Sequence, residues 1–271
     1  MSLDLYGEKC FGFDFICCED PMTAIAKIYT PEGFVVATDG RKLNNQTGKF
    51  TDDIQKVFEL SHISGKMCFS VAGVGEFLVA PESSLMVSDI ISESAGFIAE
   101  ASVQNSDDYA ELLRMQIQLE LQDRNLSSLA SGSVTETHIF LDGYILGRPM
   151  RRKITLDYKS GKLMTSWSDE EGTPPGYAFG RGSETVWGII FGSAPDSRLA
   201  SYRQICQPPR PATLSQAIRV CHAAICAHCD PEALTIDREN CQGVGGRIRI
   251  ATVTPSEGFR MVSETDCHQS I

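Results

Sequence analysis

The first regular pattern along the chain is a series of short, mainly apolar runs rich in the residue types that favour β-strands. Two such runs, 24–29 and 34–39, are joined by Thr-Pro-Glu-Gly, a sequence that suits a tight turn. A second pair of runs follows at 56–60 and 67–73. The pattern therefore predicts two successive antiparallel hairpins.

Farther along, the period of the pattern changes twice. Residues 76–101 and 107–124 carry apolar side chains three and four positions apart, as an amphipathic helix does. The other expected elements are strands over 136–146, 152–157, 162–166 and 247–253, and helices over 183–191 and 214–229, the last with Thr213 as its N-cap. The segment 196–211, rich in proline and arginine, is expected to be a surface connection.

The order of these elements is two hairpins, two helices, more strands, two helices and a last strand. This is not the βαβ alternation of a parallel sheet, and it suits two antiparallel sheets packed face to face with helices on both outer faces. We therefore expect an α+β fold, a four-layer αββα sandwich, over residues 23–271. Residues 1–22 lack clean periodicity and are interpreted as an N-terminal extension, a propeptide or a mis-assigned start.

Composition narrows the classes of function. The net charge is -11 with a pI near 4.9, so the chain has no basic field to neutralise nucleic-acid phosphates. No run approaches the roughly 20 apolar residues of a membrane helix, and Asp14 interrupts the one stretch that resembles a signal core. We expect a cytoplasmic protein with no nucleic-acid or membrane partner and no cofactor.

Ten cysteines raise the question of disulfides or metal. In a cytosolic chain of this length free thiols are expected. His222, Cys226 and Cys229 form one stripe of a helix, a spacing that suits metal ligands but also small buried side chains packed on a sheet. Because no paired CxxC knuckles complete a tetrahedral set, no metal site is predicted.

The first hairpin places candidate reactive side chains at one end of a sheet. If Thr30 pairs with Gly33, Thr23 lies opposite Gly40 and Asp39 lies opposite Ala24. If the second hairpin is a neighbour in the same sheet, Lys56 reaches the same end.

A threonine beside an aspartate and a lysine suits a threonine nucleophile. A free terminal amine can take the hydroxyl proton, and a lysine cation held by the aspartate lowers the cost of the developing alkoxide. The backbone N–H of a glycine such as Gly73 can stabilise the oxyanion. The alternative is a common strand-ending turn at Asp39-Gly40 and a solvated Lys56.

Four consecutive blocks of sequence resemble the signature blocks of proteasome β subunits and their bacterial relatives. They are Met22-Thr-Ala-Ile-Ala-Lys-Ile, Gly33-Phe-Val-Val-Ala-Thr-Asp-Gly-Arg41, Gln55-Lys-Val-Phe-Glu-Leu60 and Ser70-Val-Ala-Gly73. The resemblance covers most of 22–255 and is specific over 23–75.

The resemblance assigns a role to each matching residue. It implies the fold of the N-terminal-nucleophile (Ntn) hydrolases, Thr23 as nucleophile and N-terminal base, Asp39 and Lys56 as its charged partners, and Gly73 as the oxyanion-hole glycine. Arg41 matches a basic residue that follows the family aspartate. Val71 falls where the family lines its primary specificity pocket, which implies that apolar or small side chains are accepted.

The chain departs from the family at three supporting positions. Arg181 stands between Gly180 and Gly182, where the family commonly has a serine. Before the pair Gly245-Gly246, Cys241 and Val244 replace an aspartate and a serine. The side chains that support the nucleophile in many members are therefore replaced here.

The chain also departs from the family in the residue before the threonine. Met22 precedes Thr23, whereas active members are cut after glycine. The bond is self-cleaved, or translation begins at Met22 and the initiator methionine is removed. If neither happens, Thr23 has an amide nitrogen that cannot act as a base.

Three functions agree with these residues. The first is a threonine peptidase that forms an acyl-enzyme with peptide substrates. The second is a non-catalytic structural subunit of the same fold, and the third is a small-molecule amidase. The resemblance also implies self-association into a ring or larger closed assembly, and it allows an ATP-dependent unfoldase as partner.

Overall fold

The structure is a computed structural model. It describes residues 23–44, 49–73, 75–80, 83–124, 126, 136–157, 164–169, 177–192, 196–207 and 211–266. The predicted domain boundary at 22/23 lies at the edge of these residues, and the first two residues of the predicted strand 162–166 lie outside them.

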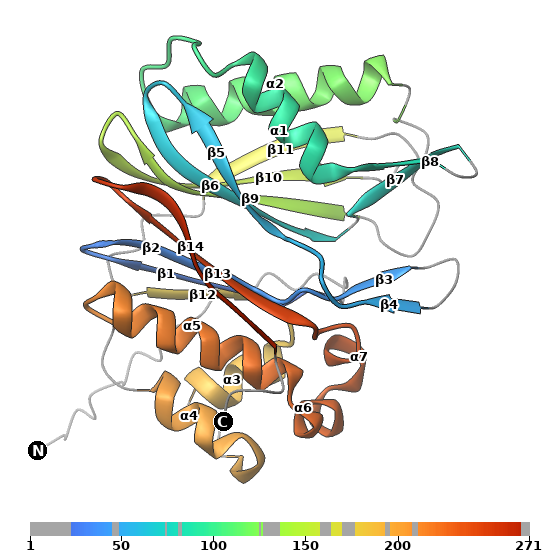
Figure 1. Cartoon of the computed structure of the whole chain (residues 1–271), viewed down its shortest axis with the longest axis vertical. Coiled ribbons are helices and arrows are strands. Elements are labelled where there is room, and N and C mark those ends of the chain that lie inside the picture. The colour runs from blue at the N-terminus through green and yellow to red at the C-terminus, as the bar shows by residue number, and fades with distance from the viewer. Residues whose placement is uncertain are drawn as a thin grey trace, which may run out of the picture.

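Two five-stranded antiparallel sheets form the centre of the molecule (Figure 1). The first sheet has the order β12-β1-β2-β13-β14, with β1 (Ile25–Thr30), β2 (Gly33–Thr38), β12 (Tyr177–Arg181), β13 (Arg247–Thr254) and β14 (Gly258–Asp266). The second sheet has the order β11-β10-β9-β6-β5, with β5 (Val57–His62), β6 (Gly65–Gly73), β9 (Glu136–Ile145), β10 (Arg148–Asp157) and β11 (Met164–Asp169).

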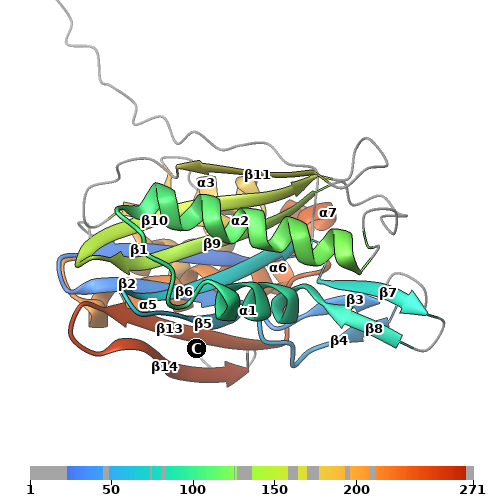
Figure 2. The ribbon, with the colours of Figure 1, turned by 90° about the horizontal axis from the view of Figure 1, so that it is seen from above.

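Helices lie on the side of each sheet that faces away from the other sheet, as Figure 1 shows. The second sheet carries α1 (Val87–Phe97) and α2 (Ser106–Asp123), which cross it side by side in the view from above (Figure 2). The first sheet carries α3 (Glu184–Phe191), α4 (Ala200–Cys206) and α5 (Leu214–Cys229), with the 3-10 turn η2 (Ser197–Leu199) and the short helices α6 (Pro231–Ile236) and α7 (Arg238–Cys241) beside them. The expected α+β class with two antiparallel sheets and helices is confirmed.

Alternation along β1 explains how the first sheet serves two interfaces. Ala26 and Ile28 pack against α3 and α5. Ile25, the residue before Ala26, packs on the opposite face, toward Phe140 of the second sheet. Because successive strand residues point to opposite faces, one strand contributes to both layers of core.

The expected helix over 76–101 is wrong over 76–86. Residues there form a hairpin of β7 (Glu76–Ala80) and β8 (Ser83–Met86), and the helix begins only at Val87. Pro81 explains the difference, because proline disfavours a helical conformation at the residue before it. This hairpin lies at the same end of the molecule as a second one, β3 (Lys42–Asn44) with β4 (Lys49–Thr51), in both ribbon views.

Two other expectations need correction. The segment 196–211 is not only a surface connection, because η2 and α4 lie within it and bury Leu199, Tyr202 and Cys206. The strand β13 does not close the chain, since β14 follows and pairs with it along its length. The strand β12, which pairs with the first strand of the domain, has no counterpart in the sequence prediction.

Candidate active site

Asp39 follows the last residue of β2 and lies beside the first residues of the described chain. The predicted register is confirmed: Thr30 pairs with Gly33, and the backbone N–H of Asp39 donates to the carbonyl of Ala24 at 3.1 Å. The Asp39 side chain is fully buried and Thr23 is 9% exposed. The hairpin therefore returns a buried carboxylate to the start of β1.

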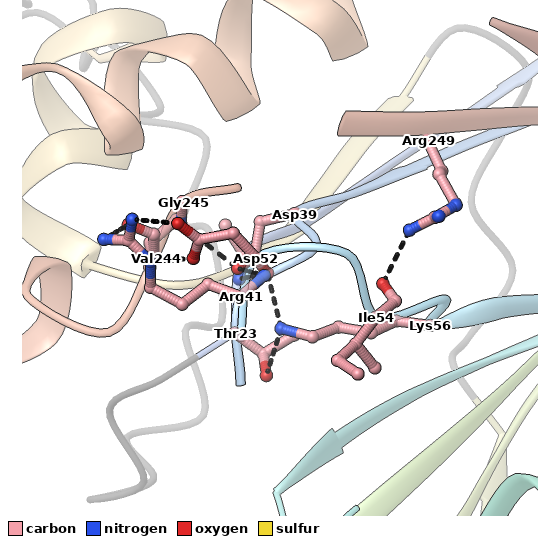
Figure 3. A network of polar contacts seen from close by, with 10 residues as sticks. Thr23, Asp39, Arg41, Asp52, Ile54, Lys56, Val244, Gly245 and Arg249 are labelled. Atoms are coloured by element: carbon pink, nitrogen blue, oxygen red, sulfur yellow. Dashed lines mark hydrogen bonds and ion pairs between the residues drawn. The ribbon is translucent and has the colours of Figure 1, made fainter. Parts of the chain in front are cut away.

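Lys56 reaches this carboxylate from the other sheet. Its Nζ lies 2.9 Å from Oδ1 of Asp39 and 3.4 Å from Oγ1 of Thr23, and its side chain is buried (Figure 3). The sequence analysis brought Lys56 to Thr23 through neighbouring hairpins of one sheet, and that route is wrong. Both edges of the β1–β2 hairpin are occupied, by β12 and by β13, so the second hairpin belongs to the facing sheet.

Four donors surround the Asp39 carboxylate. Oδ1 accepts the backbone N–H of Ala24 at 3.0 Å in addition to the Lys56 ammonium. Oδ2 accepts the backbone N–H groups of Arg41 and Gly245, each at 3.2 Å. Each carboxylate oxygen therefore accepts two donors, which hold the Asp39 side chain in one orientation next to the lysine.

Arg41 supports the site from outside it. Its guanidinium forms a two-pronged ion pair with Asp52, at 2.6 and 2.9 Å, and this hydrogen bonding raises the pKa of Arg41. The guanidinium also covers Gly245, where a Cβ atom would lie 2.6 Å from its Cζ. Arg41 therefore braces the turn that donates to Asp39.

Arg249 is a site residue that the sequence analysis missed. From β13, its Nη1 donates to the carbonyl of Ile54 at 2.8 Å (Figure 3). Its Nη2 lies 2.6 Å from Oδ1 of Asp53. These contacts fix the two residues that lead into Gln55 and Lys56. The sequence feature that could have indicated Arg249 is a single arginine in the otherwise apolar run Ile-Arg-Ile-Ala.

Gly73 and Val71 lie on β6 next to the lysine. The backbone N–H of Val71 donates to the carbonyl of Lys56 at 3.1 Å, which places this end of β6 beside the site. Gly73 has a φ of +101°, and a Cβ there would lie 2.4 Å from the carbonyl oxygen of Glu136, so only glycine fits. The Val71 side chain packs in the core beneath α1 and α2. The oxyanion and specificity roles of the two residues stay predictions.

A second polar pair lies behind the first sheet. Ser183 caps α3 through the N–H of Val186 and donates its hydroxyl to Asp237 at 2.6 Å. Burial raises the pKa of Asp237, but hydrogen bonds from Ser183 and Asn240 outweigh it, and the pKa falls below its ordinary value. The pair gives this region a buried serine and a half-buried aspartate, although Cys241 and Val244 occupy the positions where the family pattern has an aspartate and a serine.

In the Cys/His stripe of α5, Cys226 is buried in the core and His222 and Cys229 are half-buried. Cys226 Sγ lies 3.8 Å from both ring nitrogens of His222, and burial raises the pKa of the Cys226 thiol to about 11. In the part of the chain that the structure describes, no group of three or more His, Cys, Asp or Glu side chains is arranged to hold a metal. Cys229 is disulfide-bonded, which departs from the expectation of free thiols; the free and buried cysteines are Cys68, Cys206, Cys221, Cys226 and Cys241.

Comparison with known proteins identifies the fold. A Gly-1 mutant of Anbu from Hyphomicrobium sp. strain MC1 superimposes with a TM-score of 0.51 at 14% identity, covering 92% of this chain and 88% of that one. The chain has the fold of Anbu. Anbu from Yersinia bercovieri, described as an ancestral β-subunit, matches with a TM-score of 0.49 at 13% identity over 89% of this chain and 87% of that one. No protein-family model and no curated protein matches the sequence.

Among the described helices, none is long and apolar enough to cross a membrane.

Proposed function

We propose that the chain is a threonine-type peptidase or amidohydrolase related to proteasome β subunits, with the four-layer αββα sandwich of the Ntn hydrolases. The observation that carries the proposal is the position of the Lys56 ammonium, between Oδ1 of Asp39 and Oγ1 of Thr23. A cation held by a buried carboxylate next to a threonine hydroxyl lowers the cost of forming the alkoxide.

The proposed reaction proceeds through an acyl-enzyme. The α-amine of Thr23 takes the proton of Oγ1, and Oγ1 attacks the carbonyl carbon of the substrate amide. Lys56 stabilises the developing negative charge, and the backbone N–H of Gly73 binds the oxyanion. The leaving amine takes the proton as the C–N bond breaks, and water then hydrolyses the ester and regenerates the hydroxyl.

This chemistry requires a free α-amine at Thr23, and therefore a mature chain in which the bond after Met22 is absent. An amide nitrogen has no basic lone pair to accept the hydroxyl proton. The proposal accordingly divides the sequence into an extension over 1–22 and a catalytic domain over 23–271.

Mass spectrometry of the native protein tests the proposal. We expect a chain that begins at Thr23 and gains the mass of one peptide epoxyketone or vinyl sulfone, with the label on Thr23. The Thr23→Ala variant should not be labelled, whereas the matched control Thr51→Ala, an exposed threonine on β4, should be labelled as the wild type is. A native chain that still carries Met22 and resists every such probe would refute the proposal.

One observation favours a non-catalytic structural subunit as the second candidate. Arg181 and Val244 stand where the family pattern has supporting serines. This candidate predicts that no probe labels Thr23 while the protein still assembles. In both cases we propose a cytoplasmic protein that self-associates into a ring or closed assembly, with an unfoldase as a partner to be sought; light scattering after size-exclusion chromatography measures the assembly. A small-molecule amidase would be labelled at Thr23 yet hydrolyse no peptide.

A further inference from the structure

Arg181 faces the space between the two sheets. It lies between two glycines that pack closely against rings on the helix side: a Cβ on Gly180 would lie 2.1 Å from the ring of Trp187, and one on Gly182 would lie 2.9 Å from the ring of His228. Since alternate strand residues point to opposite faces, the side chain between these glycines points away from α3 and α5.

The register of β12 on β1 gives the same direction independently. Arg181 pairs with Ile25, whose side chain belongs to the core between the sheets, whereas Gly180 pairs with Ala26, which packs toward the helices. Cross-strand partners share a face of the sheet, and diagonal neighbours two residues away lie roughly 7–8 Å apart. Thr23 precedes Ile25 by two residues, so the nucleophile position is within reach of an arginine side chain at 181.

The cations around Thr23 differ in how they are neutralised. Three have a carboxylate partner, in the pairs Lys56–Asp39, Arg41–Asp52 and Arg249–Asp53. The Nη2 of Arg181, by contrast, is buried and has no hydrogen-bond partner among the residues that the structure describes. A buried guanidinium nitrogen without an acceptor is costly, and a carboxylate is the acceptor that best matches its planar fork.

We propose that Arg181 is a specificity residue that binds a carboxylate of the substrate next to the scissile amide, so that the site takes acidic peptides. The proposal rests on the proposed function, since it places the reacting amide at Thr23. It adds a subsite distinct from the one expected at Val71, because Val71 packs toward α1 and α2 and Arg181 lies on the first sheet. The arginine at this position then replaces a supporting serine with a substrate contact.

Binding to a protein that cannot react separates this role from catalysis. Calorimetry with full-length Thr23→Ala should show that a peptide with glutamate beside the central amide binds on the order of ten- to a hundredfold more tightly than its glutamine counterpart. Adding Arg181→Gln should remove this preference, and Arg181→Lys should restore part of it. Arg148→Gln, an exposed arginine at the start of β10, is the matched control and should leave the preference unchanged.

A second measurement keeps the two proposals distinguishable. The wild type and Arg181→Gln are treated with epoxyketone peptides that carry glutamate, glutamine or leucine in turn on either side of the reactive group. Labelling of Thr23 at equal rates by all probes would overturn the carboxylate subsite and leave the peptidase in place. A glutamate preference in binding that depends on Arg181, without labelling by any probe, would support the subsite and refute the peptidase. Equal binding of the glutamate and glutamine peptides would overturn the subsite.

Discussion

Replacing Asp39 by asparagine tests whether one buried carboxylate holds the site together. In the folded protein its two oxygens accept four donors: Oδ1 accepts Ala24 N–H and the Lys56 ammonium, and Oδ2 accepts the N–H groups of Arg41 and Gly245. Asparagine has the same shape but only one acceptor oxygen. In either orientation its NH₂ group faces donors and cannot satisfy them.

The expected cost follows from these contacts. If the amide oxygen keeps Ala24 and Lys56, the buried N–H of Gly245 and the half-buried N–H of Arg41 lose their acceptor, at about 1–3 kcal/mol each. If the amide turns over, the buried Lys56 ammonium loses its partner, a change that costs about 3–5 kcal/mol. The protein adopts the cheaper arrangement, so we expect a loss of about 2–5 kcal/mol in the free energy of unfolding.

Urea denaturation followed by circular dichroism measures this loss. Asp52→Asn is the matched control, because it makes the same change in an ion pair with Arg41 whose carboxylate side chain is 52% exposed. An exposed pair contributes about 0–1 kcal/mol, so the control should shift the midpoint little. A loss below about 1 kcal/mol for Asp39→Asn, or one equal to that of the control, would refute the view that Asp39 organises the site.

Three further variants test other parts of the structure. Gly73→Ala should cost about 1–3 kcal/mol, because alanine at φ +101° places Cβ against the Glu136 carbonyl; an unchanged thermal midpoint would contradict this. Burial lowers the pKa of His228 below its ordinary 6.5, so below about pH 6.5 the unfolded chain binds a proton that the folded chain does not, and stability falls. His228→Gln should flatten that fall between pH 7 and 5 in denaturant titrations, and identical profiles would exclude the cause. Asp142→Asn removes the buried carboxylate that Lys27 and Arg151 share, so the free energy of unfolding should fall by about 3–5 kcal/mol in the same assay. A fall below about 1 kcal/mol would contradict this.

Local sequence was enough to place Asp39 beside the start of β1. The two segments are joined by a tight turn, and the pairing of Thr30 with Gly33 fixes every later pair along the hairpin. Lys56 was also predicted to lie at this point, and it does. It comes from the facing sheet, however, and not from a neighbouring hairpin of the same sheet. Strand pairing within a hairpin can be read from the turn, whereas the sheet to which a hairpin belongs depends on distant strands.

The contacts that the sequence analysis missed all join distant segments. Gly245 donates to Asp39 across 206 positions, and Arg249 donates to Ile54 across 195. Turn chemistry and periodicity carry no information about such separations. Arg249 was therefore given no role in the sequence analysis, although it is buried between the sheets and uses its charge to hold the loop before Lys56.

The buried ion pair between Asp39 and Lys56 helps to distinguish a hydrolase from a structural subunit. A buried pair such as Asp39–Lys56 is weak evidence for stability, since well-packed apolar side chains of similar volume often do as well or better. A structural subunit has no need of it, and none for a lysine 3.4 Å from a threonine hydroxyl. If alkoxide charge develops on Thr23, the Lys56 ammonium stabilises it and Asp39 holds the ammonium in place. Under the proposed function, Thr23, Lys56 and Asp39 are already in contact in the folded domain, and the bond after Met22 decides whether Thr23 can react.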